Sequence, residues 1–471
     1  MPWPQQPLIY EINTWAWLDS LSRAKGKTVT LASVPAREWD ELAAWGFDAV
    51  WLMGVWERSP RSVEIARTHA GLLDEYNRAL PDFTPDDVVG SPYSVHRYEV
   101  DARLGGRKGL ASARRALSKR GMRLILDFVP NHTANDHPWI DEYPEHYVPG
   151  LPHGRDPYFP PWTDTTQLNA ASPSYRRAAI DTLRDIAGQA DGVRCDMAML
   201  LVSAVFERTW GTRPDPEFWP ELIEGARAAA PDLLLLAETY WDMEWELLQQ
   251  GFDFCYGKRL YDRLVNGAAG SVREHLTEDV DYQRRLVRFI ENHDERRAAS
   301  VFAPDQNRAV ALVQATLPGA RLYHEGQLTG AQVKLPVQLG RRPQEPPDVS
   351  LCDFYKKLLP AARENCSGQW QLCDIDGWPD NQSCRNFVAW TWRAKDRRTL
   401  VVANLSTVTS QGRVRAPWPD LADRSWRLAD PINCDTFDRN GDEMIEPGLF
   451  VALDPWHFHF LEIRDSTLCH Q

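Results

Sequence analysis

Short apolar runs alternate with amphipathic stretches through the first three-quarters of the chain. Runs of this length, bounded by polar residues or glycine, are typical of parallel strands that are buried on both faces. Seven are clear, and an eighth, at 252–256, is weaker. The candidate strands are residues 8–12, 49–53, 124–129, 192–195, 233–237, 252–256, 286–290 and 320–323.

Helical patterns lie between these runs. Ser172 and Pro173 form an N-cap and a first-turn proline, and apolar residues then recur on one helical face up to Ala187. Residues 110–120 form a second such stretch, which stops at Gly121, and residues 220–230 form a third. Eight strands that alternate with helices over roughly 350 residues predict an α/β fold, a (β/α)8 TIM barrel.

One spacing predicts an insertion into this barrel. The third and fourth runs end near Asp127 and Asp196, which are 196 − 127 = 69 residues apart, whereas a strand-helix-strand unit needs only about 30. We therefore expect a loop-rich subdomain after strand 3, at 133–171, on the face where a barrel keeps its active site. The barrel itself is expected to comprise residues 1–132 and 172–370.

The pattern changes after a helix expected at 349–362. Short strand candidates follow at 387–392, 400–405, 426–428 and 457–463, and turns such as 439–442 separate them. This alternation predicts an antiparallel, β-sandwich-like domain over 380–471.

Composition narrows the class of partner. The 471 residues are 43% hydrophobic and 25% charged, with a formal net charge of −13 and a pI near 5.5. This negative balance argues against nucleic acid as a partner. No apolar run is long enough to span a bilayer, and the N-terminus lacks a signal-peptide pattern. We expect a cytoplasmic protein that binds neither nucleic acid nor membrane, with its eight cysteines reduced.

Four of the candidate strands end in carboxylates, which are Asp127, Asp196, Glu238 and Asp294. Parallel barrel strands open on one face, so these side chains are expected to meet in one pocket. Like charges in one pocket raise one another's pKa, which a purely structural role does not require. Glycoside hydrolysis does require it, since a retaining enzyme pairs a carboxylate nucleophile with a carboxylic acid that protonates the leaving oxygen.

The residues around these acids match a known family in order and spacing. The chain resembles the alpha-amylase family of retaining glycosidases over roughly residues 8 to 330. Each motif alone is weak, and their common order makes the resemblance specific. The matching stretches are 91–93, 127–132, 167–169, 192–196, Glu238 and 292–294.

The resemblance implies roles for the acids. Asp196 would attack the anomeric carbon, and Glu238 would protonate the leaving oxygen and then activate the incoming water or sugar. Asp294 would bind sugar hydroxyls most tightly in the transition state. Arg194 would orient Asp196 and keep it ionised, while Asp127 would support Arg194 without taking part in catalysis.

Three further residues are implied to contact the sugar. Tyr93 would stack on the cleaved ring, and His132 and His293 would hydrogen-bond its hydroxyls. Residues 324–327, after the eighth strand, are also expected to face the pocket mouth. The segment 155–162 either walls the cleft with aromatic rings or is a rigid, proline-braced loop.

The chain departs from the family directly after the nucleophile, where many starch-cleaving members carry a lysine and a histidine. Residues 197–200 here are Met-Ala-Met-Leu, so the leaving-group side is expected to be more apolar. Asn131 matches a residue that often ligates structural calcium in the family; otherwise no cofactor is expected.

The resulting hypothesis is a retaining glycosidase that acts on α-glucosidic bonds of oligo- or polysaccharides. The alternatives are a transglycosidase or sugar isomerase of the same family and, less favoured, a non-catalytic carbohydrate-binding relative. The sequence leaves the sugar, the linkage, endo or exo action and the oligomeric state open.

Overall fold

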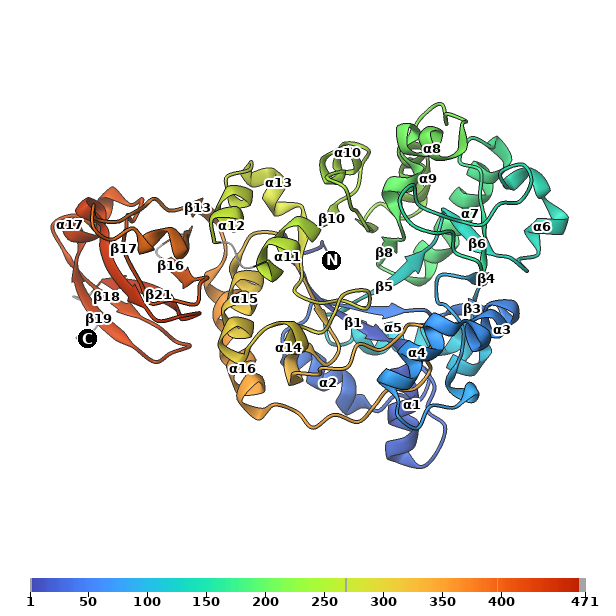
Figure 1. Cartoon of the computed structure of the whole chain (residues 1–471), viewed down its shortest axis with the longest axis horizontal. Coiled ribbons are helices and arrows are strands. Elements are labelled where there is room, and N and C mark those ends of the chain that lie inside the picture. The colour runs from blue at the N-terminus through green and yellow to red at the C-terminus, as the bar shows by residue number, and fades with distance from the viewer. Residues whose placement is uncertain (1, 267–268, 396, 466–471) are drawn as a thin grey trace.

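Eight parallel strands close into a barrel in the computed structural model, which describes residues 2–266, 269–395 and 397–465 (Figure 1). The predicted (β/α)8 fold is therefore confirmed, and the weakest strand candidate is a barrel strand. In hydrogen-bonding order the strands are β1 (Leu8–Asn13), β12 (Ala320–His324), β11 (Leu286–Arg288), β10 (Phe254–Tyr256), β9 (Leu234–Ala237), β8 (Gly192–Cys195), β5 (Arg123–Phe128) and β2 (Ala49–Met53).

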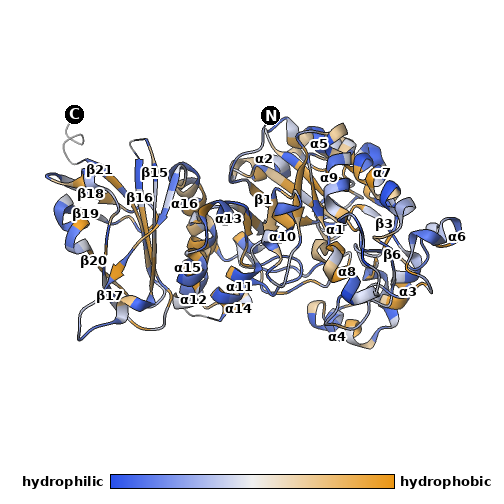
Figure 2. Ribbon diagram, turned by 90° about the horizontal axis from the view of Figure 1, so that it is seen from above, coloured by the Kyte–Doolittle hydropathy of each residue, from blue (hydrophilic) through white to orange (hydrophobic). Residues whose placement is uncertain are grey.

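Amphipathic helices cover the outside of the barrel. In α7 (Pro173–Gln189), Ser172 accepts a hydrogen bond from the N–H of Tyr175 at the N-terminus, and Leu183 and Ile186 are fully buried. Figure 2 shows apolar residues concentrated on the strands and polar residues on the outer helix faces. Among the described residues, no helix is long and apolar enough to cross a bilayer. Other helices of this layer are α1 (Thr14–Lys25), α2 (Ala36–Ala44), α5 (Gly106–Ser118), α9 (Phe218–Ala229), α15 (Pro304–Thr316) and α16 (Val349–Asn365).

The long connection after the third barrel strand, β5, consists mainly of loops. β6 (His132–Ala134) pairs antiparallel with β7 (Thr165–Gln167), and α6 (Trp139–Glu142) lies between them in the sequence. This small sheet brings His132 back beside Gln167 at the barrel mouth.

A second long connection follows β2, and the sequence analysis did not anticipate it. It contains a two-stranded antiparallel sheet of β3 (Trp56–Arg58) and β4 (Val95–Val100). The helices α3 (Pro60–Thr68) and α4 (Ala70–Ala79) lie between those two strands in the sequence. Pro60 at the first helical position and the Ser59 side chain, which accepts from the N–H of Ser62, start α3.

The C-terminal part is the expected antiparallel β domain. A six-stranded sheet faces a three-stranded sheet, and an apolar cluster that includes Leu400, Trp426 and Val451 lies between them. The six strands are β13 (Gln369–Leu372), β15 (Phe387–Ala394), β16 (Arg397–Asn404), β21 (Phe458–Asp465), β18 (Ser425–Ala429) and β19 (Thr436–Asn440); the three are β14 (Ile375–Asp376), β17 (Ser410–Val414) and β20 (Leu449–Leu453).

The prediction of a turn at 439–442 is wrong. Asn440 ends β19, and its side chain accepts hydrogen bonds from the N–H groups of Asp442 and Glu443, which starts the short helix α17 (Gly441–Glu443). The hairpin turn between β18 and β19 lies at 430–435 instead. Asparagine favours an N-cap as well as a turn, so the residue type alone did not separate the two.

The β domain packs firmly on the barrel. The indole N–H of Trp392 donates to the carbonyl of Thr316 at the end of α15, at 2.7 Å. Arg273 donates to the carbonyl of Phe387, also at 2.7 Å. One buried apolar cluster runs from the barrel helices to Trp390 and Phe460 of the six-stranded sheet.

A glycine at the start of the eighth barrel strand provides a test of this packing. Gly319 has a φ of +116°, and a Cβ atom there would lie 2.2 Å from the carbonyl oxygen of Leu286. We expect Gly319→Ala to lower the free energy of unfolding by about 1–3 kcal/mol, measured by urea denaturation. Gly188→Ala in α7, where a Cβ would have open space, is the control and should be neutral or slightly stabilising. Equal midpoints for both variants would contradict this account.

Candidate active site

The carboxylates at the strand ends meet at the C-terminal mouth of the barrel, as expected. A pocket of about 470 Å³ there is lined by Asp196, Glu238 and Asp294, together with Tyr93 and His132. This volume is within the range of about 300–1,000 Å³ that small-molecule sites have. Arg194, Asp127 and His293 lie behind these residues, each at most 3% exposed.

Arg194 is the centre of the charged cluster. Its Nη1 lies 2.7 Å from Asp196 Oδ1 and its Nη2 lies 2.9 Å from Glu238 Oε2. Asp127 Oδ1 is farther away, at 3.9 Å, and Asp127 instead accepts hydrogen bonds from the Trp51 indole and the Gly54 N–H. Asp127 thus anchors the end of β2 more directly than it supports Arg194.

Glu238 has a different set of neighbours from Asp196. Its Oε2 accepts a hydrogen bond from the N–H of Met197 at 2.6 Å, and its Oε1 accepts one from the Tyr240 hydroxyl at 2.9 Å. Burial, with Asp196 and Asp294 nearby, raises the pKa of Glu238 to about 7 although Arg194 opposes this. Burial also raises the pKa of Asp196, to about 6, and Arg194 limits that rise. Burial thus makes both carboxyl groups easier to protonate than they are in water.

Met197 reaches Glu238 because its backbone is in the left-handed region, with φ of 44°. Such a conformation costs a non-glycine residue of the order of 1 kcal/mol and persists only where its surroundings impose it. Here it directs the Met197 amide towards Glu238 and places the Met197 side chain in the pocket wall.

His293 joins three pocket groups into one hydrogen-bonded chain. Its Nε2 lies 2.9 Å from Asp294 Oδ2 and 2.7 Å from the Tyr93 hydroxyl, and its Nδ1 contacts the carboxylate of Glu11. Although burial opposes protonation, Asp294 and Glu11 raise the pKa of His293 to about 10. In return, and against the effect of burial, His293 lowers the pKa of Asp294 well below its ordinary value. The pocket thus contains an imidazolium beside an ionised aspartate.

His132 lies on the other side of Tyr93. Its Nε2 is 3.2 Å from the Tyr93 carbonyl oxygen, and its ring lies 5.0 Å from that of Trp162. Burial lowers the pKa of His132 to about 4, so the ring is neutral at pH 7. The structure thus brings together all of Tyr93, His132, Arg194, Asp196, Glu238, His293 and Asp294, with Asp127 in contact behind them.

Comparison with known proteins agrees with this geometry. The family model for the alpha amylase catalytic domain matches residues 38–180. The chain is 24% identical to Alpha-amylase MalA of Haloarcula japonica over 384 residues, which cover 77% of this chain and 49% of that protein. It is 29% identical to an alpha-1,4-glucan:maltose-1-phosphate maltosyltransferase of Rhodospirillum rubrum, over 59% of this chain and 39% of that protein. The expected resemblance to the alpha-amylase family is therefore confirmed by a family model and by curated relatives.

Solved structures are similar in fold along nearly the whole chain. An alpha-amylase from Geobacillus thermoleovorans, in a complex with acarbose, superposes with a TM-score of 0.73 at 19% identity and covers 98% of this chain and 99% of that one. AmyB, a maltogenic alpha-amylase from Thermotoga neapolitana, gives a TM-score of 0.72 at 17% identity, with coverage of 97% and 98%. The first two curated relatives are longer proteins, and the chain spans only about half of their length.

The residues after the nucleophile depart from the family pattern in a specific way. Only Met197 lines the pocket, whereas Ala198, Met199 and Leu200 are at most 3% exposed and belong to the main apolar core. In the segment 155–162, Trp162 lines the pocket, whereas Tyr158 and Phe159 are 58% and 67% exposed.

Calcium at Asn131 stays a prediction from the family resemblance. The Asn131 side-chain oxygen accepts a hydrogen bond from Gln167 at 3.0 Å, and the Asn131 amide lies 3.3 Å from the Gln167 oxygen. No cluster of three or more His, Cys, Asp or Glu side chains suited to a metal occurs in the part of the chain that the structure describes. These contacts give Asn131 a structural role, which is to join the end of β5 to β7.

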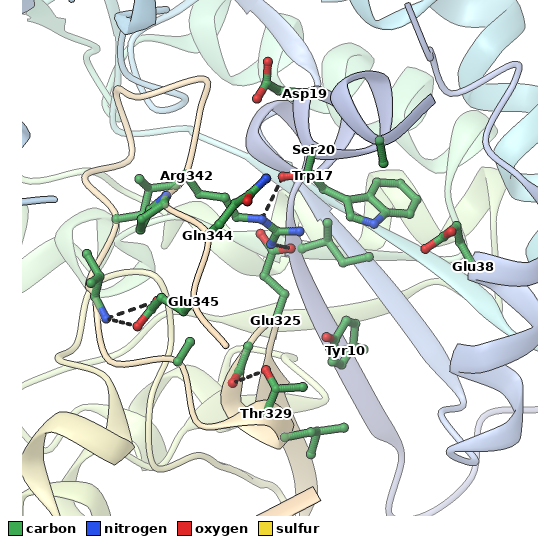
Figure 3. Close-up of a pocket in the computed structure, with 18 of the residues that line it drawn as sticks. Tyr10, Trp17, Asp19, Ser20, Glu38, Glu325, Thr329, Arg342, Gln344 and Glu345 are labelled. Atoms are coloured by element: carbon green, nitrogen blue, oxygen red, sulfur yellow. Dashed lines mark hydrogen bonds and ion pairs between the residues drawn. The ribbon is translucent and has the colours of Figure 1, made fainter. Parts of the chain in front are cut away.

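The expectation that residues 324–327 face the pocket mouth is wrong. Glu325 lies instead on a separate cavity of about 720 Å³ outside the barrel wall, between α1, α2 and the connection after β12 (Figure 3). Its carboxylate accepts a hydrogen bond from the N–H of Asn13 and pairs with Arg342. Tyr10 and Trp17 also line this cavity.

Tyr240 is a site residue that the sequence did not indicate, and Glu11 is another. Glu11 is fully buried on β1, and its contact with His293 helps to hold that ring charged. A charged residue inside the apolar run 8–12 was the available signal, since acids are almost never fully buried unless they are paired.

We expect Glu11→Gln to lower kcat/KM about 30-fold, or by about 2 kcal/mol, because a charged hydrogen bond to His293 is lost. Without Glu11 the pKa of His293 should fall from about 10 towards its ordinary value. His293 would then lose its charge as the pH rises, so activity should decline at lower pH than in the wild type. Measurement of kcat/KM from pH 5 to 10 tests this.

The matched control is Glu291→Gln. Glu291 is equally buried, but its partners, Arg297 and the N–H of Ala298, lie outside the pocket. This variant should lose stability and keep the wild-type pH profile. An unchanged pH profile for Glu11→Gln would contradict the role of Glu11.

Proposed function

We propose that this chain is a retaining enzyme that acts on α-glucosidic bonds by double displacement. The observation that carries the proposal is that Asp196 and Glu238 share the Arg194 guanidinium, at 2.7 and 2.9 Å, while their other contacts differ. A retaining mechanism requires two carboxyl groups in different surroundings, one as the nucleophile and one as the acid. The α configuration and the glucosyl substrate are taken from the family, whose named relatives are amylases and glucan-modifying enzymes.

In the first step, Asp196 attacks the anomeric carbon while the bond to the leaving oxygen breaks. Glu238 transfers its proton to that oxygen, so the leaving sugar departs as a neutral alcohol. Arg194 keeps Asp196 ionised before attack and then faces the Glu238 carboxylate that forms. The Tyr240 hydroxyl and the Met197 N–H stabilise that same carboxylate.

In the second step, the oxygen of an incoming water or sugar hydroxyl attacks the anomeric carbon. The Glu238 carboxylate takes the proton from that hydroxyl. The bond between the anomeric carbon and Asp196 breaks as the new bond forms, and both groups return to their initial protonation states. Asp294, which is held by the charged His293, hydrogen-bonds hydroxyls of the bound ring, and Tyr93 supplies its aromatic face.

Transfer to a second sugar is the alternative to hydrolysis. Met197 and Trp162 are among the residues that line the pocket around Asp196 and Glu238, and apolar walls exclude water from a covalent intermediate. Chromatography of the products from maltooligosaccharides separates the two outcomes, since transfer lengthens part of the substrate. A sugar isomerase would instead return a disaccharide of unchanged mass.

We expect Asp196→Asn to reduce kcat by about 10⁴-fold or more on any glucan that the wild type converts. The variant should still bind maltooligosaccharides, measured by calorimetry, because only the nucleophilic oxygen is lost. The control is Asp191→Asn at the opposite end of β8, where Asp191 pairs with Arg114 outside the pocket. An active Asp196→Asn enzyme would contradict the mechanism; a wild type that binds glucans and converts none would favour a non-catalytic relative.

The pH dependence tests the role of Glu238. Asp196 must be ionised and Glu238 protonated, so activity should fall both as the pH drops through the pKa of Asp196 and as it rises through that of Glu238, about 7. Glu238→Gln should remove the alkaline limb and lose activity on glucans, yet retain the first step on α-glucosyl fluoride, since fluoride leaves without a proton. Equal losses on both substrates would assign Glu238 another role.

A further inference from the structure

Two connections from different parts of the barrel join beside the active-site pocket. One follows β2 and the other follows β12, and these strands flank β1 in the barrel. Val88 and Leu339 form an antiparallel bridge, the Val89 N–H donates to the Gln338 carbonyl, and the Gly340 N–H donates to the Asp87 carbonyl, both at 2.8 Å. Figure 1 shows the orange connection before α16 crossing to the neighbourhood of α4.

A buried arginine fixes this junction, which consists of residues 82–90 and 333–341. Arg341 is 8% exposed, and its Nε and Nη2 contact the two carboxylate oxygens of Asp87 at 2.6 and 2.7 Å. Its Nη1 also contacts Asp82 at 2.9 Å. Bidentate contacts of this kind restrict orientation as well as distance, so the two connections are held as one wall.

A shared apolar cluster also holds the two connections together. Leu80 and Val88 of the first connection share a buried cluster with Leu335 and Leu339 of the second. Arg58 adds hydrogen bonds to the carbonyl oxygens of Gly90, at 2.6 Å, and Val337, at 3.1 Å, one on each connection. Val88, Leu339 and Arg341 are buried, so the two connections form one continuous wall beside the pocket.

The junction lies on the side of the pocket that holds the sugar to be cleaved. Gln338 and Ser91 line the pocket, Ser91 is two residues from Tyr93, and Lys334 contacts the carbonyl of Asp294. In the proposed mechanism, Tyr93 and Asp294 contact the ring that Asp196 attacks. Glu238, which faces the leaving oxygen, has Met197 and Tyr240 as its neighbours instead.

The leaving-group side has a different surface. Tyr240 is followed by Trp241, whose ring lies 4.8 Å from that of Tyr158. Tyr158 is 58% exposed and its neighbour Phe159 is 67% exposed. Exposed aromatic rings next to Trp241, which is three residues after Glu238, suit the remainder of a sugar chain that extends into solvent.

We propose that the junction closes the glycone end of the pocket, so that the enzyme acts only at the non-reducing ends of α-glucans and removes a short unit at each attack. This inference rests on the proposed function, since it assigns a direction to the bound chain. In an α-glucan the glycone is the non-reducing part, and a wall there excludes internal bonds. The chemical class of substrate is therefore an oligo- or polysaccharide with a free non-reducing end.

Two fluorescent maltoheptaosides test the proposal. Both carry the same label at the reducing end, and one also carries a 4,6-O-ethylidene group on its non-reducing sugar. The wild type should shorten the uncapped substrate stepwise. Its rate on the capped substrate should be lower by a factor of about 100 or more. Similar rates on both would overturn the closed-end inference and leave the proposed function standing. Conversion of neither would overturn the proposed function, and the inference with it.

A variant of the junction tests the same proposal by a change in the enzyme instead of a change in the substrate. Arg341→Gln removes the ion pairs with Asp87 and Asp82 and should raise the rate on the capped substrate about tenfold relative to the uncapped one. Arg120→Gln is the matched control, because Arg120 pairs with Asp40 and with two backbone carbonyls away from the pocket. If Arg341→Gln leaves the ratio unchanged although it unfolds at lower urea concentration, the junction does not decide substrate access and the proposal fails.

Discussion

A guanidinium buried at the mouth of the barrel fixes the positions of the groups proposed for catalysis. Arg194 is 0% exposed, and a buried cation without partners would cost several kcal/mol. Its charge cannot be relieved by deprotonation, because arginine keeps its proton in proteins. Asp196 and Glu238 supply the partners, at 2.7 and 2.9 Å. The interaction that stabilises the arginine therefore also holds two carboxylates around one point.

The register of the sheet determines which two residues meet at Arg194. Cys195 of β8 lies opposite Ala237 of β9, so Asp196 and Glu238 are the next residues on two neighbouring strands. Neither needs a long loop to reach the pocket. A slip of one residue would turn one of the two side chains into the apolar layer under the helices, and the buried charge of Arg194 would oppose such a slip. Fold stability and site geometry thus depend on the same pairing.

Sequence reasoning predicted the parts of the site that follow from strand ends. Asp196, Glu238 and Asp294 were found because parallel strands place their C-terminal residues on one face. The insertion after β2 was missed, although the spacing argument used for the third strand applies equally, since the strand ends near Met53 and Asp127 are 127 − 53 = 74 residues apart. Glu11 was missed because it lies within an apolar run rather than at its end.

Other features had no signal in the sequence at all. The contact of Arg341 with Asp87 joins residues 254 positions apart, in connections that have no periodic pattern. Residue type indicates that an arginine needs an acidic partner, but not which of many aspartates supplies it. The sequence also contained no indication of the cavity beside Glu325, because that cavity depends on how α1, α2 and the 326–346 connection pack together. Such loop contacts become visible only when the barrel has set the distances between them.

The departure from the family after the nucleophile has a structural origin as well as a functional one. Met197 turns the backbone with φ of 44°, and the next three residues then enter the core, where the Trp219 indole donates to the Ala198 carbonyl at 2.8 Å. A lysine or histidine at these positions would be buried among apolar side chains, and its charge would be destabilising there. The same turn directs the Met197 N–H to Glu238. The turn therefore excludes polar side chains from positions 198–200 and, in the proposed mechanism, holds Glu238 in place as the proton donor.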